Sequence, residues 1–503
     1  MGIRISDVPE DILLEVLLYL TVTDLLSLKQ TCRALHAFGS SDYVWHRLAQ
    51  RIDLPLDIPP GVALNELSHD ELQRIVVQAI RLEANWRRKC PQARRITTLV
   101  RDTNDPYVDE MQFVPGGKWL LTAQRHRQME GRWSSHVVLW SLGNMDDAYR
   151  AASMEVTGSY RSSAIELLDD GQSATVAVGV SDGIDMIEIY SFPLQDRSEI
   201  AYFVLPTPAP IWRVALHSHP RAPAISPVIH QLAVADGMIA ATVVLPGGNS
   251  PLQVFLVDVK TAYSGWVDPR YTEATDRLTT RAQPFSISWV RLYAGHLLLV
   301  GAMQSSLILR IYRLPKLRRT TSSAAGEPYI DLGPILVESK QPLRKGAEFD
   351  DVTRVSLPSA SELCVMIFYS FHDALDVGQV THFQLPFSSA LAGAGMGAGT
   401  KYVAKEECAS ATHYFSMPSQ TTAQLAQVGP SGRGVWLEHN WDTQRRRIMR
   451  YQPRDGHTIA MVLPPDPALP FTPNLCHSLA FDEVTGRVCL GLFNGDVYIL
   501  DFV

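Results

Sequence analysis

Residues 7–20 read DVPEDILLEVLLYL, residues 23–35 read TDLLSLKQTCRAL and residues 43–48 read YVWHRL. Pro9 suits the first turn of a helix, and the two acidic residues after it lie favourably against the positive end of a helix dipole. We expect Asp7 to cap this helix. Apolar residues then recur at steps of three and four, which predicts one amphipathic helix; they are Ile12, Leu13, Val16, Leu17 and Leu20.

A second helix is expected directly after the first. Thr23 or Asp24 is suited to cap it, and its apolar positions are Leu25, Leu28, Cys32 and Leu35. About forty residues cannot enclose this much apolar surface by themselves. The sequence therefore predicts that a partner, or the following part of the chain, covers one side of these helices. An ordinary helical hairpin packed on its own protein is the alternative, because periodicity alone does not separate the two.

The order of short motifs in this stretch resembles an F-box, a helical module that docks its protein on a Skp-type adaptor of a cullin–RING ubiquitin ligase. The resemblance rests on Val-Pro-Glu-Asp-Ile at 8–12, Asp-Leu at 24–25, Cys-Arg at 32–33 and Trp-x-Arg-Leu at 45–48. Val8 replaces the usual Leu of the family, and Leu35 stands where an aromatic residue is common. The resemblance implies an adaptor-binding face, or the core behind it, made of Val8, Pro9, Ile12, Val16, Leu17, Leu20, Leu25, Leu28, Cys32 and Trp45.

The composition is that of a globular chain with room for a small module and a large domain. Of the 503 residues, 46% are hydrophobic and 19% are charged, and the net charge is -7. This charge argues against nucleic acid or an anionic membrane as the main partner. The longest apolar stretch, 292–312, is interrupted by polar residues, so no membrane span is expected. The six cysteines form no Cys-x-x-Cys pair, which favours neither a zinc site nor a disulfide framework. A cytoplasmic or nuclear protein without stable membrane association is expected.

Residues 1–6 match the loose pattern for N-myristoylation at Gly2, although a short leader into the first helix is the favoured interpretation. Proline-rich residues 54–61 predict a loop. Ser68 and Glu71 then form a capping-box pattern that opens a helix reaching Trp86. This segment resembles fungal F-box proteins, which carry a similar Leu-Glu-x-Asn-Trp stretch. We expect an F-box at 1–55, a stiff helical spacer at 56–95 and a cargo-binding domain at 96–503.

From about residue 96 the pattern changes to short β-type runs separated by turn residues. One recurring element is a strand that ends in apolar-x-aromatic-x-apolar, at 138–142, 188–193, 255–259, 310–315, 381–386, 449–453 and 498–502. A turn that opens an apolar strand precedes it, at 115–121, 170–174, 294–299, 431–436 and 485–490.

These pairs resemble the second and third strands of degenerate WD-type blades. They predict a multidomain α plus all-β chain that ends in a closed β-propeller of about seven blades. The run 95–100 is suited to supply a missing outer strand and close the ring. A β-sandwich, or two β domains, is the alternative.

No motif points to catalysis, a metal or a cofactor. The glycine run 393–399 lacks the strand–helix context of a phosphate loop, and His217 and His219 have no third metal ligand nearby in sequence. The basic residues at 87–89 and 94–95 are best explained as a solvated helix end, although an acidic partner or a nuclear address is an alternative. Arg445, Arg446 and Arg447 beside Trp441 are weak candidates for gripping an acidic or phosphorylated cargo, and a solvated hairpin turn is favoured.

The sequence thus predicts a substrate-recognition subunit of a Skp–cullin–F-box ubiquitin ligase. The F-box would bind the Skp-family adaptor and through it the cullin, and the propeller would bind an unknown target protein. Two alternatives stay open: a protein-interaction scaffold that does not lead to degradation, and a propeller enzyme.

Overall fold

The computed structural model describes residues 8–52, 54–59, 62–100, 107–127, 133–156, 158–168, 171–194, 208–220, 222–246, 252–267, 285–303, 305–317, 329–343, 354–356, 362–369, 377–385, 410–417, 420–452, 459–462 and 469–503. Asp7, Gly2 and the glycine run 393–399 lie outside these residues.

The N-terminal part is helical: α1 (Glu10–Leu17), α2 (Val22–Lys29), α3 (Arg33–Gly39), α4 (Asp42–Arg51), the 3₁₀ turn η2 (Leu64–Glu66) and α5 (His69–Trp86). The single helix expected after residue 23 is two helices. The Thr21 hydroxyl, rather than Thr23 or Asp24, caps α2 by accepting from Asp24 N (3.2 Å). Cys32 is extended and precedes α3, so the chain turns between Lys29 and Arg33.

Helix α5 begins as the sequence predicts. Ser68 Oγ accepts from Glu71 N (3.4 Å), and the Glu71 carboxylate accepts from Ser68 N (2.9 Å). The helix has 18 residues, which corresponds to a length of about 27 Å. None of the described helices is both long and apolar enough to cross a bilayer.

The strands described after α5 form seven sheets, which we number as blades along the chain. Blade 1 contains β2 (Tyr107–Phe113), β3 (Trp119–Arg127), β4 (Trp133–Ser141) and β5 (Tyr149–Val156). The turn η3 (Met145–Asp147) joins β4 to β5. Blade 2 contains β6 (Ser159–Leu168), β7 (Ser173–Asp182), β8 (Ile184–Pro193) and β9 (Trp212–Ala215). Blade 3 contains β10 (Val228–Ala235), β11 (Met238–Val244), β12 (Gln253–Asp258), β13 (Ser264–Val267) and β17 (Tyr329–Ile330).

Blade 4 contains β14 (Ser286–Tyr293), β15 (His296–Met303), β16 (Ser306–Arg313) and β18 (Val337–Pro342). Blade 5 contains β19 (Arg354–Val355), β20 (Glu362–Tyr369), β21 (Val377–Gln384) and β22 (Ser410–Ser416). Blade 6 contains β23 (Thr421–Val428), β24 (Gly434–Asn440), β25 (Arg445–Gln452) and β26 (Ile459–Val462). Blade 7 contains β27 (Cys476–Asp482), β28 (Arg487–Leu492), β29 (Val497–Asp501) and, from the other end of the chain, β1 (Arg95–Val100); the turn η7 (Pro473–Leu475) leads into it.

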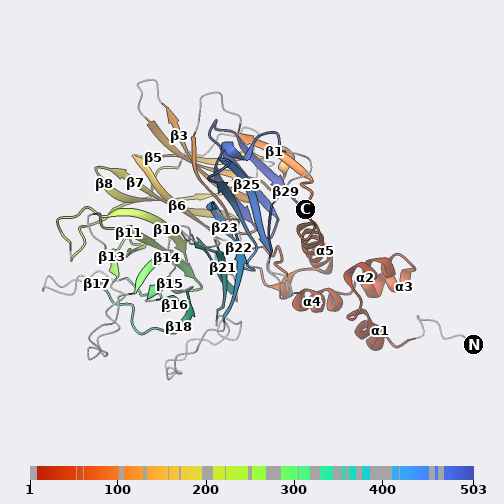
Figure 1. The fold of residues 1–503 in the computed structure, drawn as a ribbon. Helices are drawn as coiled ribbons and strands as arrows, with labels where there is room; N and C mark the ends of the chain where they lie inside the picture. The colour runs from red at the N-terminus through yellow and green to blue at the C-terminus, as the bar shows by residue number, and fades with distance from the viewer. Residues whose placement is uncertain are drawn as a thin grey trace, which may run out of the picture.

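The sheets are the blades of a seven-bladed β-propeller, which confirms the expected fold (Figure 1). All seven apolar-x-aromatic-x-apolar motifs fall on the third strand of a blade, and the turn-plus-strand motifs lead into second strands. Residues 95–100 close the ring as predicted, because β1 pairs antiparallel with β29, with Arg95 opposite Asp501. Apolar clusters fill the spaces between neighbouring blades, such as the one shared by blades 1 and 2.

The propeller has two ends, which strand direction distinguishes. In blades 6 and 7, each of the first three strands is antiparallel to the next, so the β23–β24 and β27–β28 turns share one end. The β24–β25 and β28–β29 turns share the opposite end. We call the first, with residues 429–433 and 483–486, the helix end, because α5 packs there. We call the second, with residues 440–444 and 493–496, the far end.

Candidate functional site

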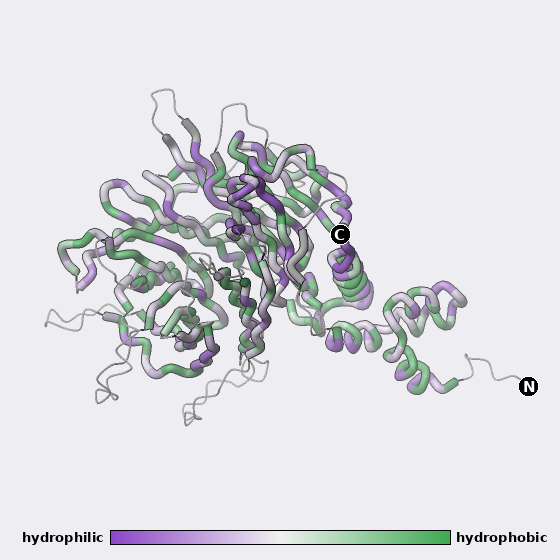
Figure 2. The backbone as a smooth tube through the Cα atoms, in the orientation of Figure 1, coloured by the Kyte–Doolittle hydropathy of each residue, from purple (hydrophilic) through white to green (hydrophobic). Residues whose placement is uncertain are grey.

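An exposed apolar face on α1 is the main candidate site. Ile12 and Val16 are 52% and 49% exposed, and Tyr19, directly after the helix, is 83% exposed. The spacing of four puts Ile12 and Val16 on one side of the helix, and Tyr19 follows three residues after Val16. Leu13 and Leu17, on the other side, are buried. Helix α1 lies at the outer edge of the molecule (Figures 1 and 2), and the described part of the chain leaves this apolar side uncovered.

The residues that the resemblance assigns to adaptor binding divide by burial. Pro9 and Cys32 are exposed together with Ile12 and Val16. The other six are partly or fully buried in the helical module. Val8, Leu20 and Leu28 are partly buried, and Leu17, Leu25 and Trp45 are fully buried. These last three belong to the core of the helical module. They therefore support the outer face and do not form it.

Trp45 organises this core. Its Nε1 donates to Gly39 O (2.8 Å), and the Lys29 ammonium lies 5.8 Å from the centre of its ring. A side chain at position 39 would collide with Lys29 Cγ, at 2.5 Å from an added Cβ. The close approach of α3 to α2 therefore requires the glycine.

A second contact sets the orientation of α1. The Tyr43 hydroxyl on α4 donates to Glu15 Oε1 (2.8 Å), and the Arg47 guanidinium lies 5.7 Å from the Tyr43 ring. Glu15 precedes Val16, so this bond holds α1 with its apolar face outward. Sequence reasoning missed Tyr43 and Tyr19. The step of seven from Ile12 is the signal that indicates Tyr19.

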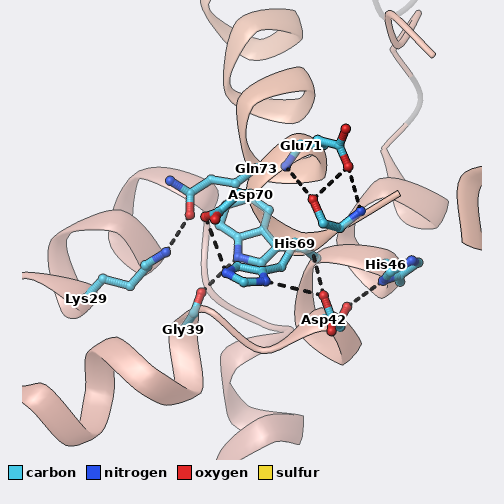
Figure 3. A network of polar contacts seen from close by, with 10 residues as sticks. Lys29, Gly39, Asp42, His46, His69, Asp70, Glu71 and Gln73 are labelled. Carbon is cyan, nitrogen blue, oxygen red and sulfur yellow. Dashed lines mark hydrogen bonds and ion pairs between the residues drawn. The ribbon is translucent and has the colours of Figure 1, made fainter. Parts of the chain in front are cut away.

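A polar network joins the helical module to the start of α5 (Figure 3). Asp42 Oδ1 accepts from His69 N (2.9 Å), and the His69 ring lies between Asp42 (3.4 Å) and Asp70 (3.3 Å). The Lys29 ammonium donates to Gln73 on α5. Burial lowers the pKa of Lys29, and the nearby Asp70 carboxylate opposes that shift. Leu72, Ile75 and Val76 of α5 complete the apolar core of the module.

The other end of α5 is built into the propeller. Trp86 is 1% exposed and packs in the core shared by blades 6 and 7. Asn85 Nδ2 donates to the carbonyl oxygens of Gln92 (2.8 Å) and Phe502 (2.7 Å), and Asn85 Oδ1 accepts from Gln92 N (2.9 Å). One amide thus ties the helix to the chain that leads into β1 and to the C-terminal segment.

Buried charges reinforce this junction. The Glu83 carboxylate pairs with the Arg433 guanidinium and accepts from Gln452 Nε2 (2.6 Å). Ser431 N and Oγ each donate to the Glu483 carboxylate at 2.9 Å. Burial raises the pKa of Glu483 to about 7, although these hydrogen bonds and the Arg433 charge oppose the shift.

Helix α5, which lies within the expected spacer at 56–95, is packed at both of its ends. Its first turns lie in the core of the helical module and its last turn lies in the core of the propeller. Because both ends are packed, the exposed face of α1 has a fixed direction relative to the propeller.

The three arginines that the sequence suggests as weak cargo-binding candidates do not form one cluster. Arg445, Arg446 and Arg447 begin β25 and do not form the hairpin turn, which spans 440–444. Strand alternation sends Arg446 to one face of the blade and the other two to the opposite face. Arg446 Nη1 donates to Cys476 O (2.8 Å).

The two histidines also separate. His219 is buried with its ring 4.9 Å from that of Trp266, whereas His217 is exposed. The described residues contain no cluster of three or more potential metal ligands. Among the basic residues near 90, Arg87 pairs with Glu83 and Arg95 pairs with Asp146.

The comparisons with known proteins bear on the N-terminal module and on the fold. Residues 5–51 match the F-box-like family. A comparison with curated proteins found no match.

The solved structures that are similar to this chain include the following three. A chain of the mitotic checkpoint complex has 10% identity and a TM-score of 0.38, with 82% of this chain and 94% of that chain covered. A structure from a study of two prolyl endopeptidases has 11% identity and a TM-score of 0.38, covering 78% and 47%. The β-propeller domain of the trilobed protease from Pyrococcus furiosus has 10% identity and a TM-score of 0.33, covering 68% and 82%. At these identities and TM-scores the three structures carry no argument about what this chain binds. The chain therefore consists of an F-box-like domain at its N-terminus followed by a seven-bladed β-propeller.

Proposed function

We propose that this protein is the substrate-recognition subunit of a Skp–cullin–F-box ubiquitin ligase. Its F-box would bind the Skp-family adaptor, and through it the cullin, while its propeller would bind a target protein. The chain itself would contribute no catalytic residue. The reaction would be promoted by proximity, because the receptor holds a lysine of the target near a charged ubiquitin-conjugating enzyme. A location in the cytoplasm or nucleus, where such ligases act, belongs to this proposal.

The single observation that supports the proposal most is the outward apolar face of α1. The helical module already has a complete core around Trp45, so Ile12, Val16 and Tyr19 are not needed to fold it. Exposed apolar side chains on one side of a helix mark a binding face. Their place inside a segment that matches the F-box-like family supports the adaptor as the proposed occupant.

Binding to purified Skp-family adaptor tests the proposal. Ile12→Asp and Val16→Asp place a carboxylate in the middle of the face, so we expect each to weaken adaptor binding by about tenfold or more. Ile184→Asp is the matched control, because Ile184 is 55% exposed on blade 2 of the propeller. It should bind the adaptor like the unchanged chain. Equal affinity in all four proteins would contradict the assignment.

A transfer assay distinguishes the receptor from a scaffold. With adaptor, cullin and conjugating enzyme present, a protein that binds the propeller should acquire ubiquitin only when the F-box face is intact. If bound proteins stay unmodified and do not accumulate after removal of this chain from cells, the scaffold interpretation replaces the receptor.

A further inference from the structure

Three large apolar side chains lie exposed at the far end of blades 6 and 7. They are Trp441 in the β24–β25 turn, Phe493 in the β28–β29 turn and Leu475 in η7, with exposed fractions of 52%, 48% and 44%. The described part of the propeller exposes eight large apolar side chains, of which these are three. Three of the eight therefore lie at one end of two neighbouring blades.

Direct contacts join these side chains into one surface. The His439 ring lies 4.4 Å from that of Trp441, and His439 stands directly opposite Arg446 in the β24–β25 ladder. Directly opposed residues project from the same face of a sheet. The Arg446 guanidinium lies 6.0 Å from the Phe493 ring. Phe493 N donates to Leu475 O at 2.9 Å. We call this set the far-end patch: Trp441, His439, Arg446, Leu475 and Phe493.

Arg446 gives the far-end patch a positive charge. Its Nη1 donates to two neutral backbone carbonyls, of Cys476 (2.8 Å) and Asn474 (3.5 Å). Within the described residues no carboxylate forms an ion pair with it. The Asp496 carboxylate of the nearby turn accepts from Asn494 Nδ2 (2.9 Å) instead. A guanidinium fixed by carbonyls keeps further N–H donors, which suit a carboxylate.

The charge of Arg446 acts on its neighbours. Burial lowers the pKa of His477, whose ring lies 4.8 Å from that of Phe493. The Asp109 carboxylate opposes that shift, and the charges of Arg125 and Arg446 add to it. Burial raises the pKa of the Cys476 thiol to about 12, and Arg446 opposes that rise. The Arg446 guanidinium therefore acts electrostatically on both of these neighbouring groups.

The turns that carry the patch are held by their own hydrogen bonds. Asn440 Oδ1 accepts from Thr443 N (2.8 Å) and Thr443 Oγ1 (2.9 Å), and Trp441 N donates to Gln420 O (2.9 Å). In the other turn, Leu492 N donates to Asp496 O (2.8 Å). Aromatic side chains on ordered turns lose little entropy when they bind a partner.

The far end lies opposite the end that packs on α5. A protein docked on the far-end patch would therefore not compete with the helix or with an occupied α1 face. The sites for adaptor and target are then on separate parts of one stiff body, which a receptor requires.

From this arrangement we infer that the far-end patch receives the target protein, and that it binds a peptide segment with an aromatic or aliphatic anchor beside a carboxylate. The anchor would lie against Trp441 and Phe493, and the carboxylate would accept from Arg446. Aromatic and arginine side chains are the residue types that dominate binding energy at protein interfaces. The inference depends on the proposed function in one respect only: the bound segment is taken to belong to a target protein of the ligase.

Selection of displayed random peptides on the full chain tests the inference without the adaptor. We expect the selected peptides to share an aromatic or aliphatic residue next to Asp or Glu. A selected peptide should bind Trp441→Ala and Arg446→Gln at least tenfold more weakly than the unchanged chain. Trp212→Ala and Arg445→Gln are matched controls, because Trp212 is exposed at the start of β9 and Arg445 lies on the other face of β25. Both should bind the peptide normally.

The thermal transition of each variant establishes that it is folded. Peptides that are neutral or basic, peptides that need phosphoserine, the absence of any enriched sequence, or equal binding to Trp441→Ala and the unchanged chain would each overturn the inference. Adaptor binding measured on the same variants separates the two proposals. If these variants lose peptide binding but keep adaptor binding, both proposals are supported. If the unchanged chain binds the peptide but does not bind the adaptor, only the proposed ligase function is ruled out.

Discussion

The indole of Trp86, the last residue of α5, stacks on the ring of Phe481 in β27, with ring centroids 5.6 Å apart and 20° between the planes. The Phe502 ring meets the same indole edge-on at 5.6 Å, and the Arg450 guanidinium lies 5.7 Å from it. The helical module is therefore attached to the propeller through a side chain in the propeller core. Movement of the module relative to blade 7 requires this indole to leave its site.

Replacement of Trp86 should lower the stability of the propeller itself. We expect Trp86→Ala to cost about 3–5 kcal/mol, because a fully buried indole leaves a cavity that the blades cannot close. The unfolding free energy in denaturant measures the change. Trp441→Ala removes the same atoms from an exposed turn and should change stability little. A small effect at both positions would show that α5 is not part of the propeller core.

Ring closure gives a second prediction, on truncated chains. Residues 81–503 keep the last turn of α5 and β1, whereas residues 101–503 lose Leu82, Trp86 and the strand that pairs with β29. We expect the longer chain to unfold in one cooperative transition. The shorter chain exposes the β29 edge and should melt at lower temperature and aggregate. Thermal unfolding and light scattering measure both effects. Equal transitions would mean that the ring does not depend on β1.

Two apolar residues of α1 should respond in opposite ways to the same substitution. Leu17 is 1% exposed and Ile12 is 52% exposed. Leu17→Asp puts a carboxylate into the core around Trp45, which should unfold the helical module at a cost of several kcal/mol. Ile12→Asp should leave the module folded and affect only binding. Protection of the α1 and α4 amides in hydrogen exchange separates the two.

Loss of protection in both variants would contradict the placement of Ile12. The propeller amides serve as the internal control, since the core of blades 6 and 7 should stay protected in Ile12→Asp. From the sequence, Leu17 and Ile12 are both predicted to belong to the adaptor face or to the core behind it, and this experiment distinguishes the two places.

The sequence predicts the propeller well because every blade repeats one local pattern. The aromatic residue of the third strand, such as Tyr190 or Tyr312, is buried between blades. Helix ends in the N-terminal module are predicted less well. Thr21, Thr23 and Asp24 all suit a helix start, and only tertiary packing of Val22 decides among them.

Contacts between distant parts of the chain leave no local signal. Glu83 and Arg433, which form an ion pair, are far apart in the sequence and meet only in the folded chain. The same holds for the two turns that form the far-end patch. The three arginines at 445–447 show what a sequence pattern misses. They are adjacent in the sequence, but strand alternation places Arg446 on one face of the blade and the other two on the opposite face. The proposed boundaries at 55 and 95 stay a prediction, because α5 belongs to both cores.

The last prediction concerns pH and the Glu483 carboxyl beneath α5. Burial raises its pKa from 4.5 to about 7 in the folded chain. The folded state therefore holds this proton more tightly than the unfolded state, so its contribution to stability is complete below about pH 4.5 and is lost as the pH rises through about 7. We expect Glu483→Gln to keep the contacts with Ser431 and to remove this loss. Denaturant unfolding from pH 5 to pH 8 should then show a steeper decline for the unchanged chain than for Glu483→Gln, by at most ~1.4 kcal/mol per pH unit. Parallel curves would place the Glu483 pKa at an ordinary value, and a variant that declines more steeply would reverse the sign of the shift.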